Sequence, residues 1–164
     1  MSNTTPSLSE GRKTYSLGID IGSTTVKIAI LDEAHHILFS DYKRHFANIQ
    51  ETLTELLQES RQKLGDLTLH PMITGSGGLT LANHLGVPFV QEVISVSTAL
   101  QELAPKTDVA IELGGEDAKI LFLSGGMEVR MNGSCAGGTG AFIDQMATLL
   151  NLPLDAMNQP AAAY

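Results

Sequence analysis

The sequence predicts an α/β fold made of two lobes of the same design. A run of strand, glycine turn, strand, turn, strand and helix occupies about residues 15–64, and it begins again over residues 108–152. Strands are recognised by alternating apolar residues and helices by apolar residues three and four apart. A helical stretch near residues 95–104 connects the two runs, so the sheet order is expected to occur twice.

The predicted domain boundaries follow from this repeat. Residues 1–14 are expected to form a flexible leader, residues 15–104 the first lobe, and residues 105–164 the start of the second lobe. The second lobe stops after its first helix, which leaves a sheet with unpaired edges. We therefore expect the chain to be the N-terminal piece of a longer protein, with its second lobe truncated.

The composition excludes several classes of function. The chain has 164 residues, is 43% hydrophobic and carries a net charge of −8. Phosphate backbones select basic surfaces, so no nucleic acid is expected as a partner. No apolar run approaches the length of a membrane span and the N-terminus does not resemble a signal peptide. The single cysteine excludes an internal disulfide, which favours the cytoplasm.

The first lobe opens with three predicted strands, over residues 15–22, 23–33 and 35–45, which form an antiparallel meander. A helix follows, with Asn48 as its expected N-cap and Gly65 as its end. The apolar residues that give this helix its spacing are Ile49, Leu53, Leu56, Leu57 and Leu64.

Residues 69–78 read as a short strand and a glycine turn, residues 79–86 as a short helix, and residues 87–92 as another strand. The second lobe then begins with residues 108–115, expected to be a buried strand that ends in glycines. Two more strands precede the stretch "NGSCAGGTGAF", which places the only cysteine, Cys135, among glycines at the start of a helix.

Two glycine turns, "DIGSTTVK" at residues 20–27 and "ELGGEDAK" at residues 112–119, match each other in order. Glycine allows close approach to a ligand, and successive free amides in such a turn bind anions. The candidate phosphate-binding residues are Gly22, Ser23, Thr24, Thr25, Lys27, Gly114, Gly115, Glu116 and Asp117. Asp20 is placed to hold Mg²⁺ through water.

Other interpretations of these turns stay open on the residues alone. Each turn is also compatible with a plain tight hairpin, and Lys27 with a side chain that points into solvent. Neither turn has the Gly-Lys-Ser/Thr of a P-loop, and no GxGxxG opens a helix as in a dinucleotide site.

The two turns resemble the first and second phosphate segments of the actin, sugar-kinase and heat-shock-chaperone ATPase superfamily. That resemblance implies two ribonuclease-H-like lobes that clamp Mg-ATP or ADP between them. "VQEVISVSTALQEL" resembles the helix that joins the lobes, which puts Glu92 where an acidic residue orients the attacking water. Asp20, Glu92 and Glu112 are the candidate catalytic residues, although Glu92 also suits a solvated helix start.

"NGSCAGGTGAFIDQMA", together with "TGSGG" at residues 74–78, resembles the activators of 2-hydroxyacyl-CoA dehydratases and the ATP-hydrolysing subunits of benzoyl-CoA reductase. The resemblance covers nearly the whole chain from Tyr15 onward. It implies that Cys135 is a ligand of a 4Fe–4S cluster shared across a homodimer. A thiolate at a helix N-terminus suits that role, whereas out of context a lone cysteine is usually a small buried residue.

The resemblance also implies the function and the partners. ATP binding or hydrolysis would change the angle between the lobes and drive one low-potential electron into a 2-hydroxyacyl-CoA dehydratase-type partner, with reduced ferredoxin or flavodoxin as electron donor. The chain departs from the pattern because each subunit should supply two cysteines and this one has a single cysteine.

We therefore expect the 164-residue piece alone to be inactive. Two alternatives on the same fold are a sugar or acetate-type kinase and a non-catalytic nucleotide-binding module. The fold does not discriminate between these functions.

Overall fold

The computed structural model describes residues 13–133 and 139–163. Its first part is a four-stranded sheet in the order β3-β2-β1-β4, made of β1 (Thr14–Ile21), β2 (Thr25–Leu31), β3 (Ile37–Arg44) and β4 (Thr68–Thr74). The first three strands are antiparallel neighbours, as predicted, and β4 adds to β1 in parallel. β1 begins at Thr14, which the sequence had assigned to the leader.

The core of this part lies on one face of the sheet. Leu17, Ile19 and Ile21 alternate along β1 with more exposed residues, which is the period of a half-buried strand. Two helices cover that face, α1 (Ile49–Leu64) and α2 (Gly78–Leu85). Both helices end at a positive-φ glycine, and α1 has Asn48 at its N-cap position without a side-chain capping bond.

Residues 87–92 do not form the predicted strand. Phe89 makes only an isolated parallel bridge with Ile73, held by hydrogen bonds from the Ile73 N–H to the Pro88 carbonyl and from the Val90 N–H to the Ile73 carbonyl. The chain then enters α3 (Glu92–Leu103) at once. Pairing stops there because the helix starts at Glu92.

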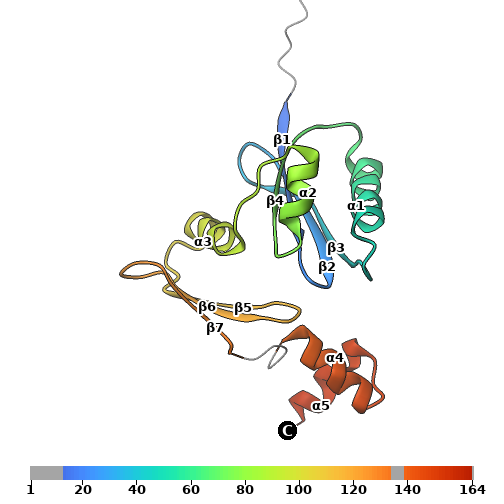
Figure 1. Ribbon diagram of the computed structural model, residues 1–164, viewed down its shortest axis with the longest axis vertical. Helices are drawn as coiled ribbons and strands as arrows, with labels where there is room; N and C mark the ends of the chain where they lie inside the picture. The colour runs from blue at the N-terminus through green and yellow to red at the C-terminus, as the bar shows by residue number, and fades with distance from the viewer. Residues whose placement is uncertain (1–12, 134–138, 164) are drawn as a thin grey trace, which may run out of the picture.

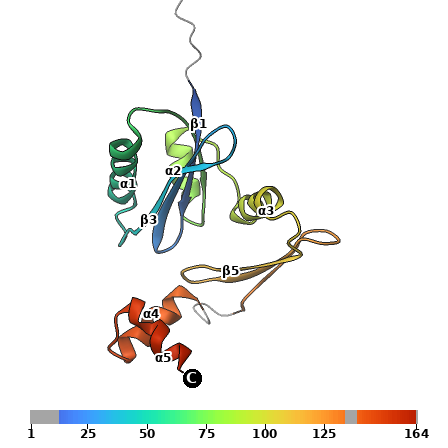
Figure 2. The ribbon, with the colours of Figure 1, turned by 180° about the vertical axis from the view of Figure 1, so that it is seen from behind.

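The second part is a three-stranded antiparallel sheet of β5 (Val109–Leu113), β6 (Ala118–Phe122) and β7 (Glu128–Met131), in that order. α3 lies between the two sheets in both ribbon views (Figures 1 and 2). The expectation that β5 is buried is wrong, because Ile111 and Leu113 are 68% and 62% exposed. Among the described residues no element covers that face of β5.

The chain continues with α4 (Gly140–Leu149), a 3₁₀ turn η1 (Leu154–Met157) and α5 (Asn158–Ala162). These helices lie beyond the three-stranded sheet, at the end of the molecule opposite to the start of β1 (Figure 2). No helix among residues 13–133 and 139–163 has the length and apolar character that crossing a bilayer requires.

Candidate functional site

A cavity of about 450 Å³ lies between the two sheets, at the turns that the sequence singled out. This volume is in the range of small-molecule sites. Its lining comprises Asp20, Gly22, Ser23, Thr24, Thr25, Lys27, Thr74, Ser76, Glu92, Ser95, Val96, Glu112, Leu113, Gly114, Gly115, Glu116, Asp117 and Lys119. Every predicted phosphate-binding and catalytic residue is in this set. Cys135 lies outside the described residues.

The two glycine turns have the same backbone geometry. The Gly22 N–H donates to the Thr25 carbonyl at 2.9 Å, and the Gly114 N–H donates to the Asp117 carbonyl at 2.8 Å. Such a bond joins the two residues that flank a two-residue hairpin loop, so each pair of strands reverses direction over two residues. The match extends into the strands, where Asp20 pairs with Lys27 in register and Glu112 pairs with Lys119.

The turns touch each other at Gly115. A Cβ on this residue would stand 2.8 Å from Thr24 Oγ1 and 3.0 Å from Ser23 Oγ, so adding one would force these side chains or the turn itself to shift. Glycine therefore lets the second turn lie directly against the hydroxyls of the first.

The N-terminus of α4 packs on the back of the second turn. The Gly140 N–H donates to the Gly114 carbonyl at 3.0 Å, and the Ala141 N–H donates to the Gly115 carbonyl at 2.8 Å. These amides belong to the first turn of the helix, where no intrahelical acceptor is available. The helix that follows the cysteine segment is thus bonded directly to a turn of the cavity.

The loop between β4 and α2 closes a third side of the cavity. Gly75 has φ +92°, and a Cβ there would collide with Asp20 Oδ1 and the Ile21 carbonyl. The Gly77 N–H donates to the same Ile21 carbonyl at 2.9 Å. This loop therefore needs glycine to pack against the end of β1, and it brings Ser76 to the cavity.

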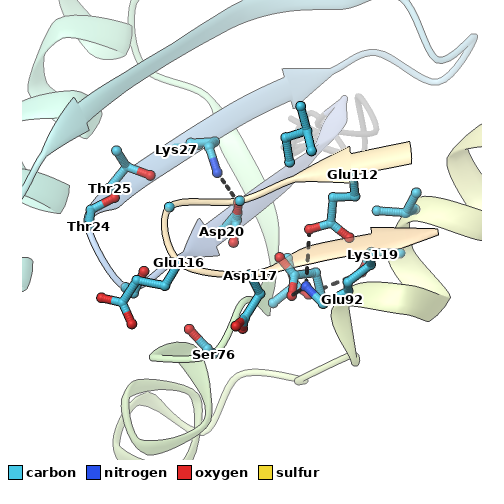
Figure 3. Close-up of a pocket in the computed structure, with 18 residues that line it drawn as sticks. Asp20, Thr24, Thr25, Lys27, Ser76, Glu92, Glu112, Glu116, Asp117 and Lys119 are labelled. Atoms are coloured by element: carbon cyan, nitrogen blue, oxygen red, sulfur yellow. Dashed lines mark hydrogen bonds and ion pairs between the residues drawn. The ribbon is translucent and has the colours of Figure 1, made fainter. Parts of the chain in front are cut away.

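The cavity lining is acidic, with five carboxylates against two lysines. Figure 3 shows that each lysine is already bonded within the site. Lys27 Nζ lies 2.6 Å from Asp20 Oδ2, so it is paired rather than free in solvent, with half of its side chain exposed. Because both lysines are paired with carboxylates, an anion bound here would be held by turn amides, hydroxyls and any accompanying cation.

Glu92, Glu112 and Lys119 form a cluster at the start of α3. Lys119 Nζ is 2.7 Å from Glu92 Oε2 and 3.3 Å from Glu112 Oε1 (Figure 3). Burial and the adjacent Glu92 carboxylate raise the pKa of Glu112. Burial also acts on Glu92, but Lys119 and a hydrogen bond with Glu112 outweigh it and lower the pKa of Glu92. Glu112 therefore takes up a proton first as the pH falls.

Sequence reasoning missed two features of the site. Lys119 was recognised as part of the second turn motif without a role, yet it is 8% exposed and joins two acids. His45 was not singled out, although its ring nitrogen Nε2 lies 3.2 Å from the Gly22 carbonyl oxygen of the first turn. A lone histidine after a strand carries no local signal, whereas the repeated acid-to-lysine spacing of the turns would have found Lys119.

Two hairpins that meet at their glycine turns over an acidic cavity, with a helix between their sheets, are the arrangement expected of the actin-like ATPase fold. The chain belongs to the BadF/BadG/BcrA/BcrD ATPase family, whose model matches residues 17–161. The family and the fold class predicted from the sequence are thereby confirmed.

Among curated relatives, the activator of lactoyl-CoA dehydratase of Anaerotignum propionicum is 30% identical, over 87% of this chain and 56% of its own length. The (R)-2-hydroxyglutaryl-CoA dehydratase activating ATPase of Acidaminococcus fermentans is 28% identical, over 84% and 54%. The chain thus spans about half the length of the curated relatives it matches.

Two solved structures share this fold at 27% identity. Component A of the A. fermentans (R)-2-hydroxyglutaryl-CoA dehydratase has a TM-score of 0.71, with 86% of this chain and 56% of that chain covered. The activator of the 2-hydroxyisocaproyl-CoA dehydratase from Clostridium difficile, with bound ADPNP, has a TM-score of 0.67, with 85% and 53% covered.

Proposed function

We propose that this chain is the nucleotide-binding part of an ATP-dependent activator, which delivers a low-potential electron to a 2-hydroxyacyl-CoA dehydratase or benzoyl-CoA reductase-type partner. The observation that carries the proposal is the pair of matched turns, which touch each other at Gly115 over one cavity. The names of the relatives and the ADPNP bound in one of them support the choice of ATP and of the dehydratase partner.

Magnesium fits the donor set of the cavity. Asp20 Oδ1 is buried and has no hydrogen-bond partner among the described residues, while Oδ2 bonds Lys27. Mg²⁺ selects oxygen ligands and keeps several waters, so an otherwise unpartnered carboxylate oxygen suits a water-mediated contact. The excess of carboxylates over lysines also favours a triphosphate that arrives with its cation.

The phosphates would be held by the turns and the attacking water by the acids at α3. Free turn amides and the hydroxyls of Ser23, Thr24 and Thr25 are donors of the kind that phosphate oxygens accept. Glu92, ionised by Lys119, is an acceptor suited to orienting a water for attack on the γ-phosphate. Glu112 and Lys119 would fix the direction of that carboxylate.

The residues described here do not by themselves fit an iron–sulfur cluster. A 4Fe–4S cluster takes four thiolates, and the chain supplies one cysteine, outside the described residues. No group of three or more metal-ligating side chains occurs within residues 13–133 and 139–163. The proposed cluster ligand Cys135, the homodimer and the ferredoxin or flavodoxin donor therefore rest on the family resemblance.

The test uses protein from the complete reading frame, purified without oxygen. We expect a brown, iron-containing protein that hydrolyses ATP. Asp20→Asn should lower hydrolysis by roughly 10–100-fold, as for residues that act on a metal through water. Asp66→Asn, which alters only an exposed ion pair with Arg61, should leave hydrolysis unchanged.

Three outcomes would contradict parts of this proposal. An iron-free protein after anaerobic reconstitution removes the electron-transfer part. Phosphoryl transfer to a sugar or acetate that is indifferent to Cys135→Ala indicates a kinase. Nucleotide binding without turnover, with Asp20→Ala changing only partner binding, indicates a non-catalytic module.

A further inference from the structure

The structure assigns a positioning role to His45, which lies outside both glycine turns. We propose that its imidazole fixes the peptide between Gly22 and Ser23, and so presents the Ser23 N–H to the nucleotide phosphates. This rests on the proposed nucleotide-binding function. His45 directly follows β3 and is 8% exposed, so its ring is held inside the protein.

The contacts of the ring show which of its nitrogens accepts a hydrogen bond and which one donates. The Ala47 N–H points at His45 Nδ1 over 3.0 Å, and a backbone N–H can only donate, so Nδ1 is the acceptor. The ring proton is therefore on Nε2, which donates to the Gly22 carbonyl at 3.2 Å. One neutral imidazole thus joins the loop after β3 to the first glycine turn.

The Gly22 carbonyl held by His45 belongs to the same planar peptide as the Ser23 N–H. In a trans peptide the carbonyl of one residue and the N–H of the next point in opposite directions. Fixing the Gly22 carbonyl therefore fixes the Ser23 N–H, which has no acceptor among the described residues. The His45 N–H also donates to the Thr24 carbonyl at 3.1 Å, so a single residue holds two carbonyls of this turn.

The backbone after His45 is strained in a way that favours this placement. Phe46 and Ala47 have φ values of +43° and +69°, a left-handed conformation that glycine and asparagine usually supply. The Asn48 N–H closes the turn on the His45 carbonyl at 2.6 Å. Strained turns of non-glycine residues persist where surrounding contacts require them, and often at functional sites.

Two substitutions separate positioning from mere stability. Asparagine places an amide oxygen near Nδ1, so His45→Asn keeps an acceptor for Ala47 and loses the donor to Gly22. Glutamine places an amide nitrogen near Nε2, so His45→Gln keeps the donor to Gly22 and loses the acceptor. His70→Asn, at an exposed histidine of β4 outside the cavity, is the control.

For ATP hydrolysis by protein from the complete reading frame, we expect His45→Asn to raise KM by roughly two- to tenfold, the effect of one neutral hydrogen bond, with kcat changed less. His45→Gln should keep KM within about twofold of the unchanged protein and lower Tm by roughly 2–4 °C. His70→Asn should alter neither quantity. A His45→Asn protein with unchanged KM, or a His45→Gln protein with KM as high as that of His45→Asn, would overturn the proposal.

A second readout does not depend on the nucleotide. Without ligand, the Gly22 amide should exchange with deuterium faster in His45→Asn than in the unchanged protein, and at nearly the same rate in His45→Gln. Equal exchange in His45→Asn and the unchanged protein would refute the role of His45 directly. Failure of the unchanged protein to bind an ATP analogue with Mg²⁺ would instead refute the proposed function, which keeps the two failures distinguishable.

Discussion

Asp20 and Glu112 occupy equivalent positions in the two hairpins, each opposite a lysine of the next strand. Their surroundings differ, because Asp20 has Lys27 to itself whereas Glu112 shares Lys119 with Glu92. Glu112 responds to protons, because burial and the adjacent Glu92 carboxylate oppose its ionisation and raise its pKa.

Replacing Glu112 by glutamine should reveal this response as a change in stability with pH. The folded protein binds the Glu112 proton more tightly than the unfolded chain, because its pKa is raised from the ordinary 4.5. The resulting gain in the free energy of unfolding is fully present when the pH is below the ordinary pKa of 4.5, and it is lost as the pH rises through the raised pKa. Glutamine does not ionise. The Tm of Glu112→Gln minus the Tm of the unchanged protein should therefore grow as the pH rises, to roughly 2–4 °C.

The measurement is a series of thermal unfolding curves from acid to neutral pH for both proteins. Glu33→Gln, at an exposed glutamate remote from the cavity, is the matched control and should show a flat difference. A Tm difference for Glu112→Gln that shrinks as the pH rises would mean that the sign of the pKa shift is wrong.

At the scale of the elements, the two hairpins act on each other through the contact at Gly115. Gly115→Ala places a methyl group against the side chains of Thr24 and Ser23, so their hydroxyls must rotate away or the turns must separate. We expect the dissociation constant of an ATP analogue with Mg²⁺ to rise by roughly tenfold or more, given that overpacking commonly costs about 1–3 kcal/mol.

Gly18→Ala is the control for this change. Gly18 lies on β1, its added Cβ would meet only the Ala29 carbonyl at 3.9 Å, and its φ is not positive. Calorimetric titration of both variants gives the comparison. Equal affinities for Gly115→Ala and the unchanged protein would show that the nucleotide does not depend on the contact between the turns.

The elements themselves could largely be predicted from the sequence, because their signals are local. Alternating apolar residues and glycine turns located the strands of both sheets, and Gly65 and Gly86 end their helices as left-handed or positive-φ residues. The strand predicted at residues 87–92 does not form. The alternation of apolar residues and the composition do not show where pairing with the neighbouring strand stops. The exposure of Ile111 was missed because burial depends on what packs against a strand.

At the scale of the whole molecule, residues far apart in the sequence join the two parts of the chain. Arg44, at the end of β3, forms an ion pair with Asp144 of α4, in which one guanidinium nitrogen, Nη2, donates to both carboxylate oxygens at 2.9 and 2.7 Å. α4 in turn donates two backbone hydrogen bonds to the second glycine turn. The pair therefore connects the first sheet to the helix that supports the second turn.

Because both side chains of this pair are partly exposed, its contribution should be modest. A double-mutant cycle of Arg44→Ala and Asp144→Ala, followed by denaturant unfolding, should give a coupling of about 0.2–1 kcal/mol. High salt should reduce it, since exposed charges are screened. A coupling above about 3 kcal/mol that salt does not change would mean that the pair behaves as a buried one.

The candidate site could be predicted from the sequence where its residues lie in the repeated motif or, as for Glu92, in the stretch that resembles the helix joining the lobes. The turns, with Asp20 and Glu112 before them, come together in the structure because a duplicated hairpin puts the same residues in the same places. His45 and the contact of Gly140 with the second turn arise from packing between distant segments. No spacing in a single sequence encodes such contacts.

The central claim, that the two turns hold one triphosphate between them, is tested most directly by a crystal structure of the protein with an ATP analogue and Mg²⁺. The account predicts phosphate oxygens within hydrogen-bonding distance of amides in both residues 22–25 and residues 114–117, with the cation near Asp20. A nucleotide bound elsewhere, or one whose phosphates contact a single turn, would contradict it.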